Sequence, residues 1–125
     1  MTWTLTPDWP KPPLSMNQRL HWAAKKDLTA SIRQTVKLLA KNAKIPTLAH
    51  ADVLMVWTVP TLHRRDADNP APTLKAACDG LVDAGIVPDD TPQWMTKHMP
   101  FIEYERGVKA VRFEIRGDVW LGGAR

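Results

Sequence analysis

The sequence contains very little cysteine and no long apolar segment. Its single cysteine, Cys78, cannot form an internal disulfide or supply a zinc site built from several cysteines. The longest apolar run, Val53–Trp57, is far shorter than the roughly 20 residues that span a bilayer. The first residues also lack the basic segment and the apolar stretch of a signal peptide. These absences favour a soluble protein of the reducing cytoplasm with no membrane partner.

Length and composition predict one globular domain. The chain has 125 residues, of which 44% are hydrophobic and 24% are charged. These proportions exclude a disordered tail, a collagen-like fibre and a coiled coil, and the length predicts a single domain over residues 1–125. The net charge of +4 favours a polyanionic partner such as nucleic acid, although many small proteins are equally basic. Six of the 13 acidic residues lie between Asp66 and Asp90, which makes this segment an acidic island.

The residue pattern predicts a mixed α/β (α+β) domain with a mixed sheet and two main helices. Alternating apolar residues predict strands, and apolar residues at helical spacing predict helices. The expected order is β-α-β-α-β-β, with a hairpin at the end. The expected elements are strands near 2–6, 52–59, 93–99 and 108–116, and helices near 25–42 and 72–84. The strand at 52–59 is apolar on both faces, which predicts a central strand covered on both sides.

Each predicted helix has one apolar face. The second helix places Leu74, Cys78 and Leu81 on its apolar stripe and is expected to end at Gly85, so Cys78 is expected in the core. The first helix carries an apolar stripe and a separate basic side. This basic side is either an ordinary solvated face or a surface that contacts phosphates. Its basic residues are Lys26, Arg33, Lys37, Lys41 and Lys44.

The segment Arg64–Asn69 holds two closely spaced carboxylates beside two arginines. In an extended backbone Asp66 and Asp68 would point to the same side, and paired carboxylates of this kind suit Mg²⁺ or Mn²⁺. The flanking Arg64 and Arg65 fit a phosphate-bearing substrate that arrives beside the metal. The alternative is that Asp and Asn before a helix are simply caps and turn formers. On the same reasoning, Asp89–Asp90 can be an ordinary turn, and Lys75 with Asp79 an ion pair on one helix face.

Three segments in order resemble the RusA family of Holliday junction resolvases. They are Arg65–Asn69, with its Asp-x-Asp-Asn motif; Lys75–Leu81, with a lysine and an aspartate in a helix; and Ala84–Asp90, with a glycine turn and an Asp-Asp pair. The resemblance is tight over residues 64–99 and looser elsewhere. One departure is the link Pro70–Leu74, which is longer than in the shorter members of the family.

The resemblance implies the roles of individual residues. Asp66, Asp68 and Asp90 match the essential carboxylates that would hold Mg²⁺, for which Mn²⁺ may substitute, with Asp89 as the alternative to its neighbour. Lys75 matches the catalytic lysine, which would stabilise the transition state or the leaving oxygen. No histidine is required as a base, and no organic cofactor is implied. The residues expected to contact DNA are Arg64, Arg65, Asn69 and Lys75.

The function implied is a Mg²⁺-dependent endodeoxyribonuclease. It would resolve Holliday junctions and other branched DNA by paired symmetric nicks during recombination or repair. The family members act as homodimers on the two-fold symmetric junction, and the expected setting is the cytoplasm of a bacterial host cell, in phage or prophage biology. Two other interpretations stay open: a catalytically silent protein that binds branched DNA, and a small metal-binding structural domain without a DNA partner.

Overall fold

A central strand, β2 (Ala51–Val59), organises the fold in the computed structural model, which describes residues 1–124. Its run of apolar side chains makes it the most deeply buried strand, as the sequence predicts. The other elements, in chain order, are β1 (Thr2–Leu5), α1 (Trp22–Asn42), α2 (Ala71–Asp83), β3 (Met95–Lys97), β4 (Phe101–Tyr104) and β5 (Ala110–Arg116). The predicted α+β class and element order are confirmed, with β4 as an additional short strand that the sequence analysis missed.

The sheet is mixed because β2 has different partners on its two edges. On one edge β2 pairs antiparallel with β5, which pairs in turn with β1. On the other edge β2 pairs in parallel first with β3 and then with β4. The predicted terminal hairpin is therefore wrong, since β2 lies between β4 and β5. A central strand must satisfy its backbone groups on both edges, and the two C-terminal segments supply those partners.

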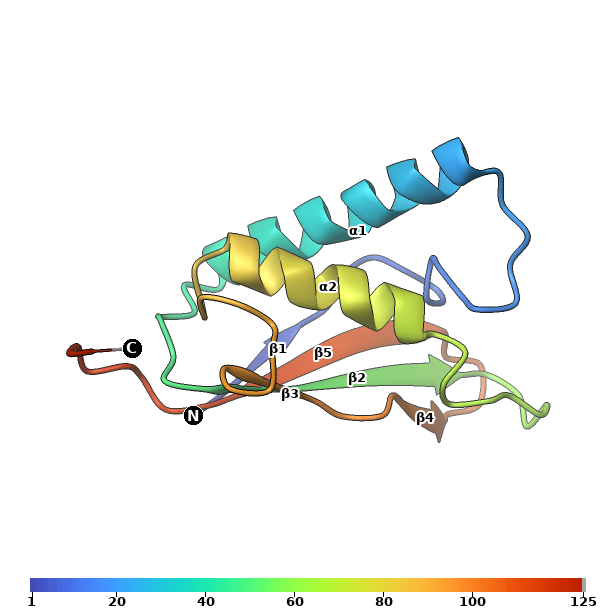
Figure 1. Cartoon of the computed structure of the whole chain (residues 1–125). Coiled ribbons are helices and arrows are strands. Elements are labelled where there is room, and N and C mark those ends of the chain that lie inside the picture. Colours follow the sequence, from blue (N-terminus) through green and yellow to red (C-terminus); the bar gives the residue numbers. More distant parts are fainter. Residues whose placement is uncertain (125) are drawn as a thin grey trace.

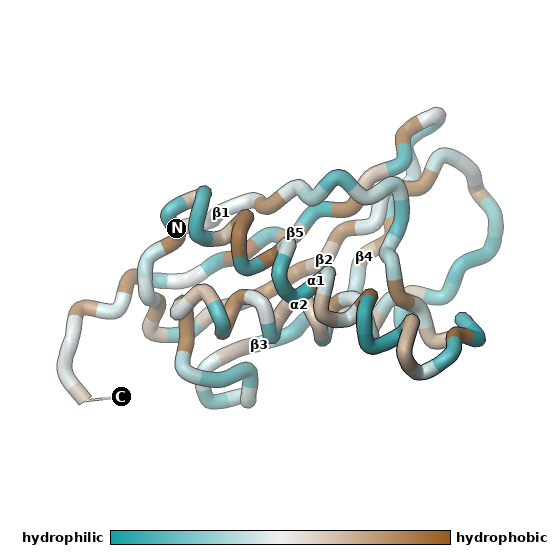
Figure 2. Tube along the Cα trace, turned by 90° about the horizontal axis from the view of Figure 1, so that it is seen from above, coloured by the Kyte–Doolittle hydropathy of each residue, from teal (hydrophilic) through white to brown (hydrophobic). Residues whose placement is uncertain are grey.

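Both helices lie on the same face of the sheet (Figure 1). Val53 and Met55 of β2, together with Phe113 of β5, point into the core, where they meet Ile32 of α1 and Leu81 of α2. On β5 hydrophobic and hydrophilic residues alternate (Figure 2), so its opposite face is polar. Within the described part of the chain, no helix is long and apolar enough to cross a membrane.

The prediction that β2 is covered on both faces is wrong. Among residues 1–124, no helix lies over the second face of the sheet (Figure 1). Val56 is nevertheless buried there, because it lies opposite Arg112 in the register, and Arg112 pairs with Glu103 of β4 and with Glu114 of its own strand. Long paired side chains thus replace the second layer that the apolar pattern suggested. We call this surface the helix-free face.

The two helices approach each other closely at Gly80. A Cβ atom at this position would overlap the carbonyl oxygen of Arg33, so only glycine allows this approach. The Arg33 guanidinium also forms an ion pair with Asp83 across the same contact. As predicted, α2 stops before Gly85: the helix ends at Asp83, Ala84 caps it, and Gly85 follows with a φ of +83° in the left-handed region. The start of α1 is three residues earlier than predicted, because His21 Nδ1 accepts a hydrogen bond from the Ala23 amide and caps the helix.

Candidate functional site

A carboxylate held by two lysines lies beside α2. Asp90 follows the C-terminus of α2, and its Oδ2 accepts hydrogen bonds from Lys75 Nζ at 2.5 Å and from Lys97 Nζ at 2.7 Å. Lys75 also donates to Asp79 Oδ1 at 3.0 Å, one turn along the helix. The Asp90 side chain is only 14% exposed, whereas that of Lys75 is 57% exposed. We call Lys75, Asp79, Asp90 and Lys97 the lysine–aspartate cluster.

The chain places these four side chains together by simple local rules. Lys75 and Asp79 are four residues apart on α2 and therefore share one face of the helix. The chain after α2 turns at Gly85 and runs back, so that Asp90 reaches the side of the helix. In β3, Met95 is buried, and Lys97, two residues further, points to the same side of the sheet.

The electrostatics of the cluster fix its charge state near neutral pH. Hydrogen bonds from Lys75 and then Lys97 hold the pKa of the Asp90 carboxyl well below its ordinary range, against the opposing effect of burial. The hydrogen bond to Asp90 raises the pKa of Lys75 in turn. Asp90 is therefore an anion and Lys75 a cation near neutral pH. Behind them, burial raises the pKa of the Cys78 thiol to about 12, so this cysteine is an inert part of the core, as predicted.

The predicted carboxylate motif lies in the loop between β2 and α2. Asp66 and Asp68 are exposed, and the nearest cation to Asp66 is the Arg64 Nε at 3.9 Å. The predicted extended backbone is wrong here. The Asn69 amide donates to the Asp66 carbonyl at 3.1 Å, and a turn begins. Caps and turn formers, the second interpretation of these residues, describe this backbone well. We call residues 60–70 the site loop.

Two residues expected to contact DNA also hold the site loop in shape. Arg65 donates to the carbonyl oxygens of Thr61 and His63 at 2.9 and 3.1 Å, and its guanidinium lies 5.7 Å from the centre of the Trp57 ring. Asn69 accepts a hydrogen bond from the Asn17 amide through its side chain. The site loop is thereby tied to the proline-rich loop that precedes α1. Both loops lie at the end of the sheet where β2 stops (Figure 1).

The structure joins some of the predicted site residues and leaves others apart. Lys75 and Asp90 meet directly, and the predicted ion pair of Lys75 with Asp79 is confirmed. No hydrogen bond or ion pair in the described range 1–124 links Asp66 or Asp68 to this cluster. Asp89 accepts a hydrogen bond from the Asp90 amide, as in an ordinary turn.

The fit of a divalent metal is partial. Carboxylate oxygens are the donors that Mg²⁺ prefers, and Asp66 and Asp68 offer them at the surface. Asp90, however, is already neutralised by two ammonium groups. Across residues 1–124, no three His, Cys, Asp or Glu side chains are grouped so that they could hold a metal ion. The donor chemistry thus suits Mg²⁺, but the three aspartates do not converge on one position.

Lys97 is the residue of the cluster that the sequence analysis missed. The alternation of Met95 and Lys97 in a short strand places them on one face, but the sequence does not say which loop that face meets. Only the return of the chain after α2 brings Asp90 over β3. No sequence signal pairs Lys97 with Asp90, because the two residues lie seven positions apart on either side of a turn.

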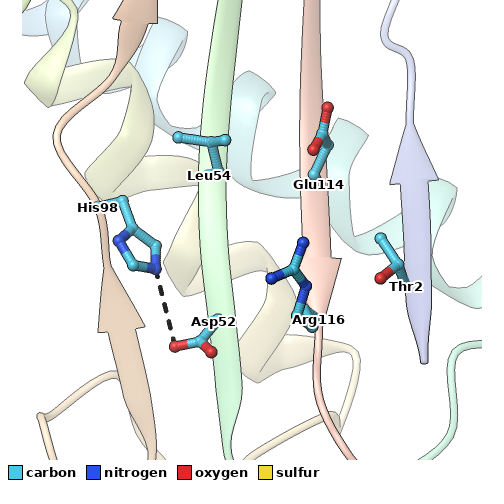
Figure 3. Close-up of a pocket in the computed structure, with 6 residues that line it drawn as sticks. All are labelled: Thr2, Asp52, Leu54, His98, Glu114 and Arg116. Atoms are coloured by element: carbon cyan, nitrogen blue, oxygen red, sulfur yellow. Dashed lines mark ion pairs between the residues drawn. The ribbon is translucent and has the colours of Figure 1, made fainter.

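The helix-free face carries a surface hollow (Figure 3). It has a volume of about 300 Å³ and is lined by Thr2, Asp52, Leu54, His98, Glu114 and Arg116. His98 Nε2 lies 3.8 Å from Asp52 Oδ1, and His50 Nε2 lies 4.0 Å from the same oxygen. The two carboxylates of its lining make this hollow a poor site for a phosphate.

No family model and no curated protein matches the chain.

Proposed function

We propose that this protein is a Mg²⁺-dependent endodeoxyribonuclease that cuts branched DNA, including Holliday junctions. The observation that carries the proposal is the lysine–aspartate cluster, in which an exposed lysine is oriented by a partly buried carboxylate. The cluster joins Lys75 and Asp90, two of the residues that match the RusA pattern. The net charge of +4 and the arginines of the site loop agree with a polyanionic substrate.

The residues of the cluster have distinct chemical parts in this proposal. The Lys75 ammonium is half exposed and permanently charged near neutral pH, so it can bind a phosphate oxygen and stabilise negative charge that develops there. Asp90 and Asp79 hold this ammonium in place. Lys97 balances the charge of Asp90. Asp66 and Asp68, free of ammonium partners within hydrogen-bonding distance among the described residues, would hold Mg²⁺.

The same proposal includes a homodimer in the cytoplasm of a bacterial host cell. A four-way junction has approximate two-fold symmetry, so two symmetric nicks require two sites related by a two-fold axis. The helix-free face offers a surface for such a contact, because it carries acidic and basic side chains, among them Asp52 and Arg116, that would meet their opposites across a two-fold axis. Sedimentation equilibrium at micromolar concentration would measure a mass twice that of the 14.1 kDa chain.

A catalytically silent protein that binds branched DNA is the second candidate. Two observations favour it: Lys75 and Lys97 both donate to the Asp90 carboxylate, and no contact links Asp66 or Asp68 to Asp90 among the described residues. Both candidates require binding of a junction, and only the first requires cutting.

Binding and cutting can be separated in one experiment. A labelled four-way junction is titrated with the protein in EDTA, with a linear duplex of the same sequence as control, and Mg²⁺ is then added. We expect tighter binding to the junction than to the duplex, followed by nicks. Binding without nicks in Mg²⁺ or Mn²⁺ would favour the silent protein. Absence of binding would leave a structural domain without a DNA partner.

A further inference from the structure

Four surface hollows are linked in series by the lining residues that they share. The first, beside β2, and the second, under the proline-rich loop, share Lys11 and Trp57. The second and third share Ser15 and Gln18. The third and the fourth, on the first turns of α1, share Lys25. Because neighbouring hollows share lining residues, they form one surface, which we call the basic track.

The charged residues that line the basic track are all basic. Among the described residues, no aspartate or glutamate lines any of its four hollows, although the chain has 13 acidic residues. The hollow on the helix-free face, by contrast, is lined by Asp52 and Glu114. Arg33 belongs to the track but is paired with Asp83, so it contributes less charge. The cations along the track are Lys11, Arg19, Lys25, Lys26, Arg33, Arg65 and Lys109.

Tryptophans lie at two points of the basic track. Trp57 lines its first two hollows and is partly buried beneath the Arg65 guanidinium. Trp22 opens α1 in the fourth hollow and is 72% exposed, with its ring 5.5 Å from that of His21. Interleaved cations and aromatic rings are typical of surfaces that bind an unpaired nucleic acid strand, since cations bind the phosphates and rings stack on the bases.

The basic track also passes the candidate site. Arg65 and Asn69, which line it, flank the two exposed carboxylates of the site loop. A strand lying along the track would therefore pass directly beside Asp66 and Asp68. Of the seven cations along the track, Arg33 alone among the described residues is paired with a carboxylate in an ion pair, so the charge pattern favours a long polyanion over a neutral or cationic ligand.

We propose that the basic track binds the backbone of one DNA strand at a branch point, and that Trp22 stacks on an unpaired base of that strand. This inference rests on the proposed function, because it assigns the surface through which the same site would receive its substrate. The hollows measure about 190 to 420 Å³ and share lining residues, as expected for a surface along which a strand lies rather than a single cavity that encloses a ligand.

Paired charge-removal variants test the track. Lys11→Ala/Lys109→Ala removes two exposed cations beside Trp57, and Lys37→Ala/Lys41→Ala removes two cations of α1 that line none of the hollows. Binding to a labelled four-way junction is measured in EDTA at several salt concentrations. We expect the track variant to bind about tenfold or more weakly, with a salt dependence reduced by about two ion equivalents. The control variant should stay close to wild type.

The stacking contact has its own readout. Trp22→Ala should weaken binding to the junction about fivefold or more, whereas Trp22→Phe keeps a ring and should retain most of the affinity. Binding to a fully paired duplex should change little in either variant. Circular dichroism and thermal melting establish that each variant is folded, which the exposure of these side chains leads us to expect.

The outcomes separate the track from the proposed function. Equal losses in the track and control variants would mean that net charge alone drives binding, and would overturn the track while DNA binding stands. Unchanged affinity in Trp22→Ala would overturn the stacking contact. Tighter binding to a matched RNA junction would assign the surface to RNA instead. If wild type binds no junction at all, the proposed function and the track both fail.

Discussion

Replacing Lys97 by methionine removes one of the two ammonium groups that neutralise Asp90. Lys97 Nζ donates to Asp90 Oδ2 at 2.7 Å, and the two side chains are 31% and 14% exposed. A charge-assisted hydrogen bond in such a partly buried setting contributes about 1.5–3 kcal/mol. Methionine keeps the length of the side chain. We therefore expect Lys97→Met to lower the free energy of unfolding at pH 7 by about 1.5–3 kcal/mol.

The loss should depend on pH in a defined direction. The pKa of Asp90 is lower in the folded state than in the unfolded chain, so its pairing stabilises the fold above the unfolded pKa of about 3.9. This stabilisation disappears as the pH falls through the folded-state pKa and the carboxylate is protonated. Wild type should therefore lose stability on acidification more steeply than Lys97→Met, and the two should converge in strong acid.

Urea unfolding followed by circular dichroism measures this effect between pH 7 and pH 2. The control is Lys109→Met, the same change at an exposed lysine of the β4–β5 loop. A cycle with Asp90→Asn isolates the pair, because the cost of Asp90→Asn should be smaller in the Lys97→Met background. A loss of equal size at pH 7 and pH 2, or additive effects in the cycle, would refute the reasoning.

Three further predictions concern the packing, the thiol and the proposed reaction. Gly80→Ala should lower stability by about 1–3 kcal/mol in urea unfolding, because its methyl group would overlap the Arg33 carbonyl between the helices; a neutral or stabilising effect would mean that the helices separate at no cost. Cys78 should resist iodoacetamide at pH 8 in the native state and react in urea, since burial raises the pKa of its thiol to about 12; rapid native labelling, read by mass spectrometry, would contradict its place in the core. If the protein is a nuclease, Lys75→Gln should slow nicking of a junction about 100-fold with little change in binding, and an unchanged single-turnover rate would remove Lys75 from the reaction.

Much of the fold could be predicted because its signals are local. The apolar run of β2, the helical spacing of Ile32 and Val36, and the glycine at position 85 each act over a few residues. The prediction of a terminal hairpin was wrong because strand pairing depends on which strand edges need partners. Both edges of β2 need a partner, and the C-terminal strands pair with β2 instead of with each other. The prediction that a second layer covers the other face of β2 was wrong because the ion-paired Arg112 side chain shields Val56 there. An apolar sequence pattern does not distinguish this arrangement from a second layer.

The candidate site was less accessible to sequence reasoning. The spacing of Lys75 and Asp79 on a helix predicted their ion pair, and the contact is present. The predicted geometry of Asp66 and Asp68 was wrong. The prediction required an extended backbone, and the structure has a turn there that the Asn69 amide closes. Neither the contact of Lys97 with Asp90 nor the basic track could be predicted from the sequence. They arise where segments far apart in sequence, such as Lys11 and Lys109, line one hollow.

Strand-resolved nicking of a four-way junction tests the central claim most directly. Each of the four strands is end-labelled in turn, and wild type is compared with Asp68→Asn in Mg²⁺, since this change keeps the size of the side chain and removes its charge. The account predicts symmetric nicks in two strands of like polarity for wild type, and junction binding without nicks for Asp68→Asn. Binding by both proteins with no nick in Mg²⁺ or Mn²⁺ would contradict it.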